Sequence, residues 1–450
     1  MPAVSFHPLW TESTALRKYN IMRHIFLSLL SLLSIVGLNA QDMTLRADYI
    51  FSGTDKTQEI ALDELSCFDG WAGRRVNLDS IPVRGNGQIS MTDPVSGEVL
   101  YRQSFSTLFQ EWQATEEAVY VRKAFENVFL LPMPSSRAVV KVELYDFKGN
   151  VSASMSHVVD PSDILIRRVV REPAPHKYLL KNGSPEEKID VAIVAEGYTE
   201  SEAGLFYDDA EKAMKAILSH EPFASMSDRF NFIAVALPSQ ESGVSVPGEG
   251  VWKETALGSH FNTFYMDRYL TTLRLRQMHD RLCGLPYEHF VILANTDTYG
   301  GGGIYNSYTL TTAHHPAFEP VVVHEFGHSF AGLADEYYYD DQFVEYYYPD
   351  CEPWEQNITT LFDFPSKWED MLPKVVAVPT APYGNDLWKD ISEGKDPMSV
   401  VGVYEGAGYQ SKGVYRPFPD CRMKTNAADA FCPVCQRAIA RIIRFQTEQQ

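Results

Sequence analysis

The chain has 450 residues, of which 45% are hydrophobic and 12% aromatic, and its formal net charge is -20 at pH 7. This length allows two or three domains, and the composition is that of a globular protein rather than a disordered chain. Residues 1–40 carry three basic residues and one acidic residue, so the remaining residues carry a net charge of -22. Such an acidic surface argues against nucleic acid and anionic membranes as partners.

Residues 1–40 have the pattern of a secretory signal peptide. Basic Arg23 precedes the largely apolar residues 25–38, and Ala40 supplies a small residue at the expected cleavage point. The apolar run is shorter than the ~20 residues that a membrane span needs, and no cysteine follows it for lipid attachment. Met22 is an alternative start. We predict an exported protein, periplasmic or secreted, without a membrane span after signal removal; the oligomeric state stays open.

Residues 42–161 are predicted to form a small all-β sandwich domain. Three segments tend to alternate apolar and polar residues, namely 44–51, 118–124 and 139–145. Two others, 93–97 and 148–150, have the composition of turns. No long helical pattern interrupts them, and the region contains no cluster of catalytic residue types. Residues 162–187 are rich in charge and proline and are predicted to be a linker.

From residue 188 to 450 the pattern changes to alternating strands and helices. The expected strands are 189–195, 230–237 and 289–294, and the expected helices between them are 201–218 and 265–283. This order predicts an α/β (α+β) domain with a mixed, mostly parallel sheet and right-handed crossovers. Residues 300–303 are four glycines, and we expect a flexible loop there, because no Lys-Ser/Thr follows as in a phosphate cradle. Residues 304–310 are a possible edge strand.

An HExxH motif follows this segment. His324 and His328 are four residues apart, so they project from one face of a helix, and Glu325 lies between them. This arrangement is typical of one catalytic zinc ion, which needs three protein ligands and one position for water. Glu325 can take a proton from the water and return it to the leaving amine. Gly332 can end the helix and turn the chain back to deliver the third ligand.

The third ligand is not fixed by the motif alone. The candidates are the downstream carboxylates Asp335, Glu336, Asp340, Asp341 and Glu345.

Residues 324–337 resemble the zinc motif of the IgA-peptidase family of bacterial metallopeptidases, which is related to the metzincins. Residues 241–244, 255–259 and 415–435 agree with this resemblance, which covers about 188–445. The N-terminal sandwich resembles the domain that often precedes such catalytic domains. The resemblance implies a metzincin-like zinc peptidase domain, and a protein substrate such as immunoglobulin A or another host protein.

The general metzincin pattern, HExxHxxGxxH/D, places the third ligand six residues after the second histidine. Here Gly332 is four residues after His328 and Asp335 is seven, so the spacing from glycine to ligand is kept. The resemblance therefore favours Asp335 as the third zinc ligand, with Glu336 as the alternative and Glu345 as a more distant candidate. Glu336 could otherwise orient a ligand histidine from outside the ligand set.

Metzincins also have a methionine in a tight turn beneath the zinc, just before a final helix. Met423 fits this Met-turn, because residues 432–443 have the pattern of that helix; Met398 is a weaker candidate. A tyrosine stabilises the oxyanion in some relatives, but the sequence does not select among Tyr404, Tyr409 and Tyr415.

Two other groups have plainer interpretations. His314 and His315 could contact a metal or substrate, but a solvated loop pair is favoured. The tyrosine runs 337–339 and 346–348 are interleaved with carboxylates that could bind calcium or substrate, and a packed aromatic loop is favoured. Calcium is otherwise not indicated.

The chain has six cysteines: Cys67, Cys283, Cys351, Cys421, Cys432 and Cys435. An even number in an exported chain favours one or more disulfides, whose pairing the sequence does not determine. Cys432 and Cys435 form a CxxC motif, but no second CxxC exists and only Cys421 lies nearby. This motif is predicted to be a structural bridge or to pack in the core.

These observations predict a secreted zinc-dependent endopeptidase with Glu325 as general base, whose substrate extends along an edge strand near residues 305–309. The alternative is a catalytically inactive protein- or glycan-binding surface module that retains a zinc site. The intact His324, Glu325 and His328 argue against that alternative, because a lapsed enzyme has no chemical need for the glutamate.

Overall fold

The computed structural model describes residues 43–339, 346–374, 376–380 and 400–449. Several sequence predictions lie outside the described residues: the signal peptide with Met22, the carboxylates Asp340, Asp341 and Glu345, and Met398. No helix in the described part of the chain combines the length and the apolar character that crossing a membrane requires.

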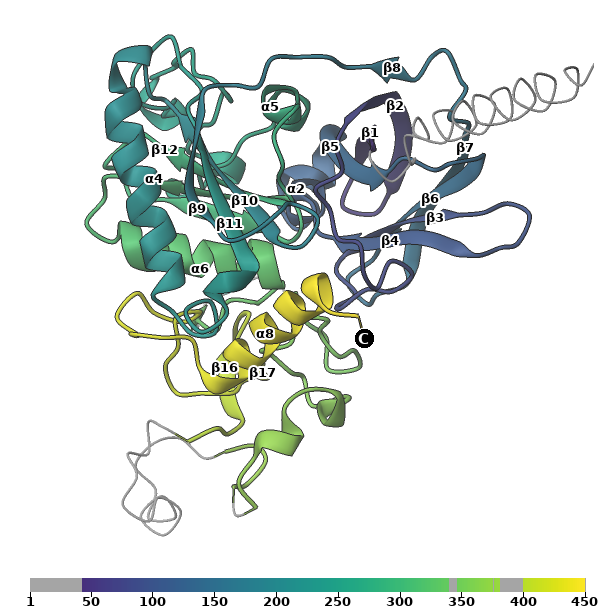
Figure 1. Ribbon diagram of the computed structural model, residues 1–450. Helices are drawn as coiled ribbons and strands as arrows, with labels where there is room; N and C mark the ends of the chain where they lie inside the picture. The colour runs from purple at the N-terminus through teal and green to yellow at the C-terminus, as the bar shows by residue number, and fades with distance from the viewer. Residues whose placement is uncertain (1–42, 340–345, 375, 381–399, 450) are drawn as a thin grey trace, which may run out of the picture.

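The N-terminal domain is a sandwich of two four-stranded sheets (Figure 1). One sheet has the strand order β5 (Lys123–Pro132), β1 (Met43–Gly53), β2 (Gln58–Asp69) and β8 (Arg167–Arg168). The other has the order β4 (Val99–Phe105), β3 (Gly87–Thr92), β6 (Ala138–Tyr145) and β7 (Val151–Val159).

Side-chain alternation explains why these strands stack as two layers. Along β6, every second residue from Ala138 to Leu144 is buried, and the residues between them are half-buried. The inner faces meet in an aromatic core, in which the ring centroids of Phe105 and Phe129 lie 4.5 Å apart. Two short helices, α2 (Leu108–Gln113) and α3 (Glu117–Tyr120), close one end.

Helix α3 occupies part of a segment for which a strand was predicted, residues 118–124. Trp112 Nε1 donates a hydrogen bond to Glu117 at 2.8 Å, and Lys123 pairs with the same carboxylate. These contacts hold a helical turn before β5 begins at Lys123.

The C-terminal domain is built on a six-stranded sheet, and the expected mixed, mostly parallel arrangement is present. Its strand order is β13 (Gly301–Ile304), β14 (Tyr308–Thr312), β12 (His289–Ala294), β10 (Ile189–Glu196), β11 (Phe230–Val235) and β9 (His176–Lys181). The four inner strands are parallel, and the two edge strands, β13 and β9, are antiparallel to their neighbours. The segment 162–187, predicted to be a linker, thus contributes one strand to each domain.

Helices cover both faces of this sheet. Val191 and Ile193 of β10 pack towards α4 (Ala203–Leu218), α6 (Phe318–Ala331) and α8 (Pro433–Thr447). Ala192 and Val194 point to the opposite face, into a core that also contains α5 (Leu275–Leu282) and the sandwich. The predicted helix at 265–283 is therefore much shorter. Tyr265 has a φ of 64°, outside the helical region, and residues 267–274 form turns and bridges instead.

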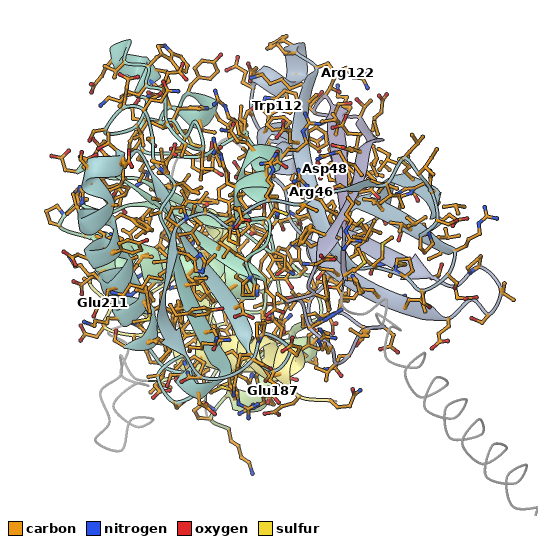
Figure 2. All side chains as sticks on the ribbon, turned by 45° about the horizontal axis from the view of Figure 1, so that its top comes forward. Arg46, Asp48, Trp112, Arg122, Glu187 and Glu211 are labelled. Atoms are coloured by element: carbon orange, nitrogen blue, oxygen red, sulfur yellow. The ribbon has the colours of Figure 1, made fainter. Side chains whose placement is uncertain are left out.

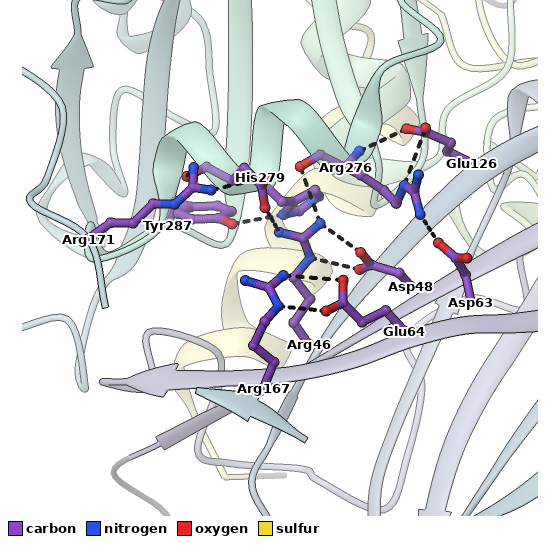
Figure 3. Close-up of polar contacts among 11 residues, drawn as sticks. Arg46, Asp48, Asp63, Glu64, Glu126, Arg167, Arg171, Arg276, His279 and Tyr287 are labelled. Atoms are coloured by element: carbon purple, nitrogen blue, oxygen red, sulfur yellow. Dashed lines mark hydrogen bonds and ion pairs between the residues drawn. The ribbon is translucent and has the colours of Figure 1, made fainter. Parts of the chain in front are cut away.

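A charged network joins the sandwich to α5 (Figure 3). Two of its members, Arg46 and Asp48, are labelled in Figure 2. Arg46 Nε lies 2.7 Å from Asp48 Oδ1, and Arg46 Nη1 lies 2.6 Å from Asp280 Oδ1 on α5. Arg276 of α5 pairs with Glu126 of β5 at 3.3 Å. Arg46 and Asp48 are 4% and 2% exposed, so each charge depends on its partner for solvation. The two domains share this network and one hydrophobic core, and they pack as a unit.

Candidate metal centre

The HExxH motif lies on α6, whose apolar side is fixed in the core. Val322, Phe326 and Phe330 are fully buried, whereas the two histidines and Glu325 on the other side stay partly accessible. The helix ends at Gly332, which has a φ of 61° and donates its N–H to the carbonyl of His328 at 2.9 Å. This turn brings the following segment back along the helix.

The turn places Asp335 against both histidines. Asp335 Oδ1 lies 3.0 Å from His324 Nε2 and 3.2 Å from His328 Nε2, and the two Nε2 atoms are 3.0 Å apart. A tetrahedral zinc ion with bonds of about 2.0–2.1 Å separates its ligand atoms by about 3.3 Å. The three side chains are therefore spaced as ligands of one ion, and the carboxylate of Glu325 belongs to the same group as the histidines.

Hydrogen bonds determine which ring nitrogen faces the centre. His324 Nδ1 lies 2.9 Å from the carbonyl oxygen of Arg422, and His328 Nδ1 lies 2.6 Å from that of Leu333. A carbonyl only accepts, so each Nδ1 carries the proton and each Nε2 presents a lone pair. Asp335 Oδ1 is buried and has no hydrogen-bond donor in the described structure. When the imidazoles are neutral, two nitrogen lone pairs and one carboxylate oxygen converge, and this set of acceptors fits a divalent cation.

The electrostatics of the site agree with a cation. Burial alone would lower the pKa of His328, but the negative charge of Asp335 outweighs it and raises that pKa to about 9. The site thus has a negative potential that favours any positive charge at the Nε2 atoms. Burial also raises the pKa of Glu325, which is the direction that makes its carboxylate a stronger base.

The glycine run forms strand β13, and our prediction of a flexible loop was wrong. A Cβ atom on Gly303 would lie 2.2 Å from the backbone oxygen of Glu325 and 2.9 Å from Cβ of His328. A Cβ on Gly301 would lie 2.9 Å from Glu325 Oε1. Gly301 and Gly303 are required because the strand lies directly on the motif helix, which leaves no room for a side chain at either position.

The predicted edge strand at 304–310 is also wrong. The chain turns at Asn306, which has a φ of 51°, and residues 308–312 form the inner strand β14. The outer edge of the sheet is β13, and Tyr269 pairs with Gly301 there in an isolated bridge. A substrate strand therefore cannot pair along residues 305–309, and part of the β13 edge is already covered.

Met423 lies beneath α6, in the turn before α8. It is fully buried, and a Cβ on Gly327 would lie 2.8 Å from its sulfur, so helix and methionine are in close contact. Its carbonyl accepts a hydrogen bond from the backbone N–H of Glu336 at 2.8 Å. The preceding residue, Arg422, orients His324 through its carbonyl. The sequence does not mark Arg422 for this role, because any residue type supplies a backbone carbonyl.

His324, His328 and Asp335 form a triad of possible metal ligands. Of the three tyrosines considered for the oxyanion, Tyr409 is the one that hydrogen-bonds to this triad. Its hydroxyl donates a short hydrogen bond to Asp335 Oδ2, and its ring lies 5.3 Å from that of Tyr337. The hydroxyl of Tyr404 donates a hydrogen bond to the carbonyl of Val400 instead. The backbone N–H of Tyr415 donates one to the carbonyl of Thr359. Tyr409 thus positions the third member of the triad.

The structure places the loop histidines outside the triad. His314 Nε2 lies 2.8 Å from Asp209 Oδ2, and His315 Nδ1 accepts the N–H of Ala317 at 3.0 Å. Neither residue belongs to a group of metal-binding side chains in the described parts of the chain.

Glu336 turns away from the triad. Its Oε1 lies 3.0 Å from Asn357 Nδ2 and 3.1 Å from Cys435 Sγ. The Nδ1 atoms of both motif histidines are held by backbone carbonyls, so Glu336 neither joins the ligand atoms nor orients a histidine.

Two regions of the chain match known families. Residues 178–396 and 389–443 match IgA Peptidase M64, and residues 39–156 match Peptidase M64 N-terminus. No curated protein matched the chain. The IgA Peptidase M64 match begins within β9 and contains His324, His328 and Asp335. The Peptidase M64 N-terminus match covers most of the sandwich. The resemblance found from the motif is thereby confirmed: the chain belongs to the IgA Peptidase M64 family, a family of metallopeptidases.

Proposed function

We propose that this protein is an exported, zinc-dependent endopeptidase with a metzincin-like catalytic domain. The observation that carries the proposal is the convergence of His324 Nε2, His328 Nε2 and Asp335 Oδ1 within 3.0–3.2 Å of one another. Two nitrogens and one oxygen are a ligand set that zinc accepts, and three protein ligands leave a position for water. The basic and apolar pattern of residues 23–40 supports export.

The chain's own groups divide the chemistry between them. A bound zinc ion would lower the pKa of its water and polarise the scissile carbonyl. Glu325, the carboxylate beside both histidines, takes the proton of the attacking water and returns it to the leaving amine. Tyr409 holds Asp335 through its other oxygen, and the carbonyls of Arg422 and Leu333 keep both imidazoles in the required tautomer.

The substrate class in this proposal is protein, and immunoglobulin A or another host protein is the first candidate. The name of the matching family supports it. On the solvent side, Arg268 donates a hydrogen bond to the hydroxyl of Tyr339 at 2.7 Å and interacts electrostatically with Glu325. These two side chains are the substrate contacts we propose, in place of the edge strand expected at residues 305–309.

The test is Glu325→Gln, measured by zinc analysis and by cleavage of a peptide library and of immunoglobulin A. Loss of the general base should reduce turnover by about 10²–10⁴-fold while the zinc content stays that of the unaltered protein. Glu319→Gln is the matched control, because Glu319 is exposed on the same helix and its ion pair in the described part of the chain is with Lys212, at 3.5 Å. Appreciable peptidase activity in Glu325→Gln would refute the mechanism. A zinc-loaded unaltered protein that cleaves nothing would favour the inactive binding module instead.

A further inference from the structure

A second group of ligand-type side chains lies beneath the triad and takes no part in the chemistry above. Cys421, Cys432, Cys435 and Glu336 come from three separate segments, and their sulfur and oxygen atoms all lie within 4.8 Å of one another. Glu336, Cys421 and Cys435 are fully buried, and Cys432 is 3% exposed. Burying a carboxylate and three thiols away from water costs free energy unless a binding partner compensates for the lost hydration.

The sulfur atoms are not joined by a disulfide. All six cysteines of the chain lie in described residues and all are free, contrary to the disulfide that their even number favoured. Cys421 Sγ and Cys435 Sγ are 3.8 Å apart. Two thiolates on one tetrahedral zinc ion, with Zn–S bonds of about 2.3 Å, are separated by about 3.8 Å. The distance between these two sulfur atoms is therefore the one expected of two ligands of a shared metal ion.

The carboxylate points to the same conclusion. Glu336 Oε1 accepts a hydrogen bond from Asn357, but Glu336 Oε2 is buried without any hydrogen-bond partner in the described structure. Leaving a buried carboxylate oxygen unpaired is costly, so the oxygen requires a positive partner.

Backbone N–H groups point at two of the three sulfur atoms. The N–H of Cys432 lies 3.1 Å from Cys421 Sγ, and the N–H of Cys435 lies 3.5 Å from Cys432 Sγ at the start of α8. Hydrogen bonds from a helix N-terminus favour the deprotonated thiol, which is the form that binds metal.

Nearby cations offset the charge that such a site would carry. Three thiolates and one carboxylate around a divalent ion leave two negative charges. Arg416 and Lys424 interact electrostatically with Glu336, and Arg422 interacts with Cys421. These side chains allow the negative site to be buried.

We propose that Cys421, Cys432, Cys435 and Glu336 bind a second zinc ion with a structural role. Four protein ligands fill a tetrahedral zinc ion and leave no position for water or substrate, which distinguishes this site from the catalytic one. Sulfur-rich tetrahedral ligation selects zinc over calcium or magnesium.

The second ion would stabilise the backbone that carries the ligands of the first. Glu336 directly follows Asp335, so fixing its carboxylate also fixes the backbone that presents the third catalytic ligand. Cys421 directly precedes Arg422, whose carbonyl orients His324. One buried ion thus ties together two segments that hold the triad.

The test uses the full chain and its metal content, with no dependence on peptidase activity. We expect two zinc ions per chain by elemental analysis of the zinc-reconstituted protein. The double variant His324→Ala/His328→Ala should retain one zinc ion, and X-ray absorption should show sulfur neighbours at about 2.3 Å. Cys435→Ser should lose the sulfur-ligated ion, whereas the control Cys351→Ser, outside the cluster, should keep both ions.

The histidine double variant keeps the proposal falsifiable if Cys435→Ser does not fold, since it leaves the cysteine cluster intact. A folded double variant without zinc, or with zinc that has no sulfur neighbours, would overturn the second site. So would a mass measurement on the denatured protein showing a disulfide among residues 421, 432 and 435. Failure of the peptidase proposal would appear separately, as an inactive protein that still binds this sulfur-ligated ion.

Discussion

Gly303→Ala should disable the protein although it changes no metal ligand and no catalytic group. Strand β13 lies on α6 so closely that the added Cβ would be 2.2 Å from the backbone oxygen of Glu325 and 2.9 Å from Cβ of His328. Neither neighbour can move by rotating a flexible side chain, because one is backbone and the other is the first atom of a triad side chain. The strand and the helix must therefore separate.

The size of this separation sets the expected effect. Restoring an ordinary contact requires a shift of about 1 Å, and a misplacement of that size can cost about 10²-fold in rate. Overpacking of a buried contact also lowers the free energy of unfolding by about 1–3 kcal/mol. We expect both losses in Gly303→Ala, with zinc binding weakened because His328 moves.

The measurements are urea unfolding of the zinc-loaded protein and kcat/KM for a fluorogenic peptide that the unaltered protein cleaves. The matched control is Gly204→Ala in the first turn of α4, where an added Cβ meets nothing within 4 Å. That change should leave kcat/KM unchanged and raise the free energy of unfolding by up to about 1 kcal/mol. The reasoning is refuted if Gly303→Ala behaves like Gly204→Ala in both measurements.

Three further predictions concern other parts of the structure. Tyr409→Phe removes the hydroxyl that bonds Asp335, so zinc affinity should fall about 10–100-fold in a competition assay with a chromogenic chelator, while the unfolding midpoint changes little. Arg46→Met leaves Asp48 buried without its partner, and urea unfolding should show a loss of about 3–5 kcal/mol. Burial raises the pKa of Asp190 to about 6, above its value in the unfolded chain. Its contribution to stability is therefore present at low pH and is lost as the pH rises through about 6. Asp190→Asn should accordingly be more stable than the unaltered protein at pH 8, by up to about 3 kcal/mol, and equal to it near pH 4; an unchanged difference across this range would contradict the assignment.

The sequence was sufficient to predict the helices and strands that are determined by their own residues. Helix α6 was expected from the four-residue spacing of His324 and His328, and its end from Gly332. The continuous apolar runs at 189–195 and 289–294 form inner parallel strands, because both faces of such strands are buried. In these cases the residues themselves carry the signal.

The segments whose secondary structure was wrongly predicted are those that depend on a tertiary contact. Glycine is depleted in strands, so residues 300–303 suggested a loop. The tertiary contact of Gly301 and Gly303 with α6 explains why this strand needs glycine at those positions. The segment 176–181 was assigned to a linker because residues 162–187 are rich in charge and proline. It becomes a strand by pairing with β11. The role of Tyr409 depends on folding that brings it to Asp335 from 74 residues away.

The pair Asp335 and Glu336 shows most clearly what spacing cannot decide. Both carboxylates come shortly after the turn at Gly332, and a pattern with one extra residue before the turn allows either to be the third ligand. The packed structure separates them, since Asp335 faces His324 at 3.0 Å and Glu336 faces Cys435 at 3.1 Å. The uncertainty over the third ligand and the unexplained CxxC motif therefore have one cause: two neighbouring acidic residues belong to two different clusters. A search for a second CxxC could not find the fourth member of the cysteine group, because that member is the carboxylate of Glu336, the residue after Asp335.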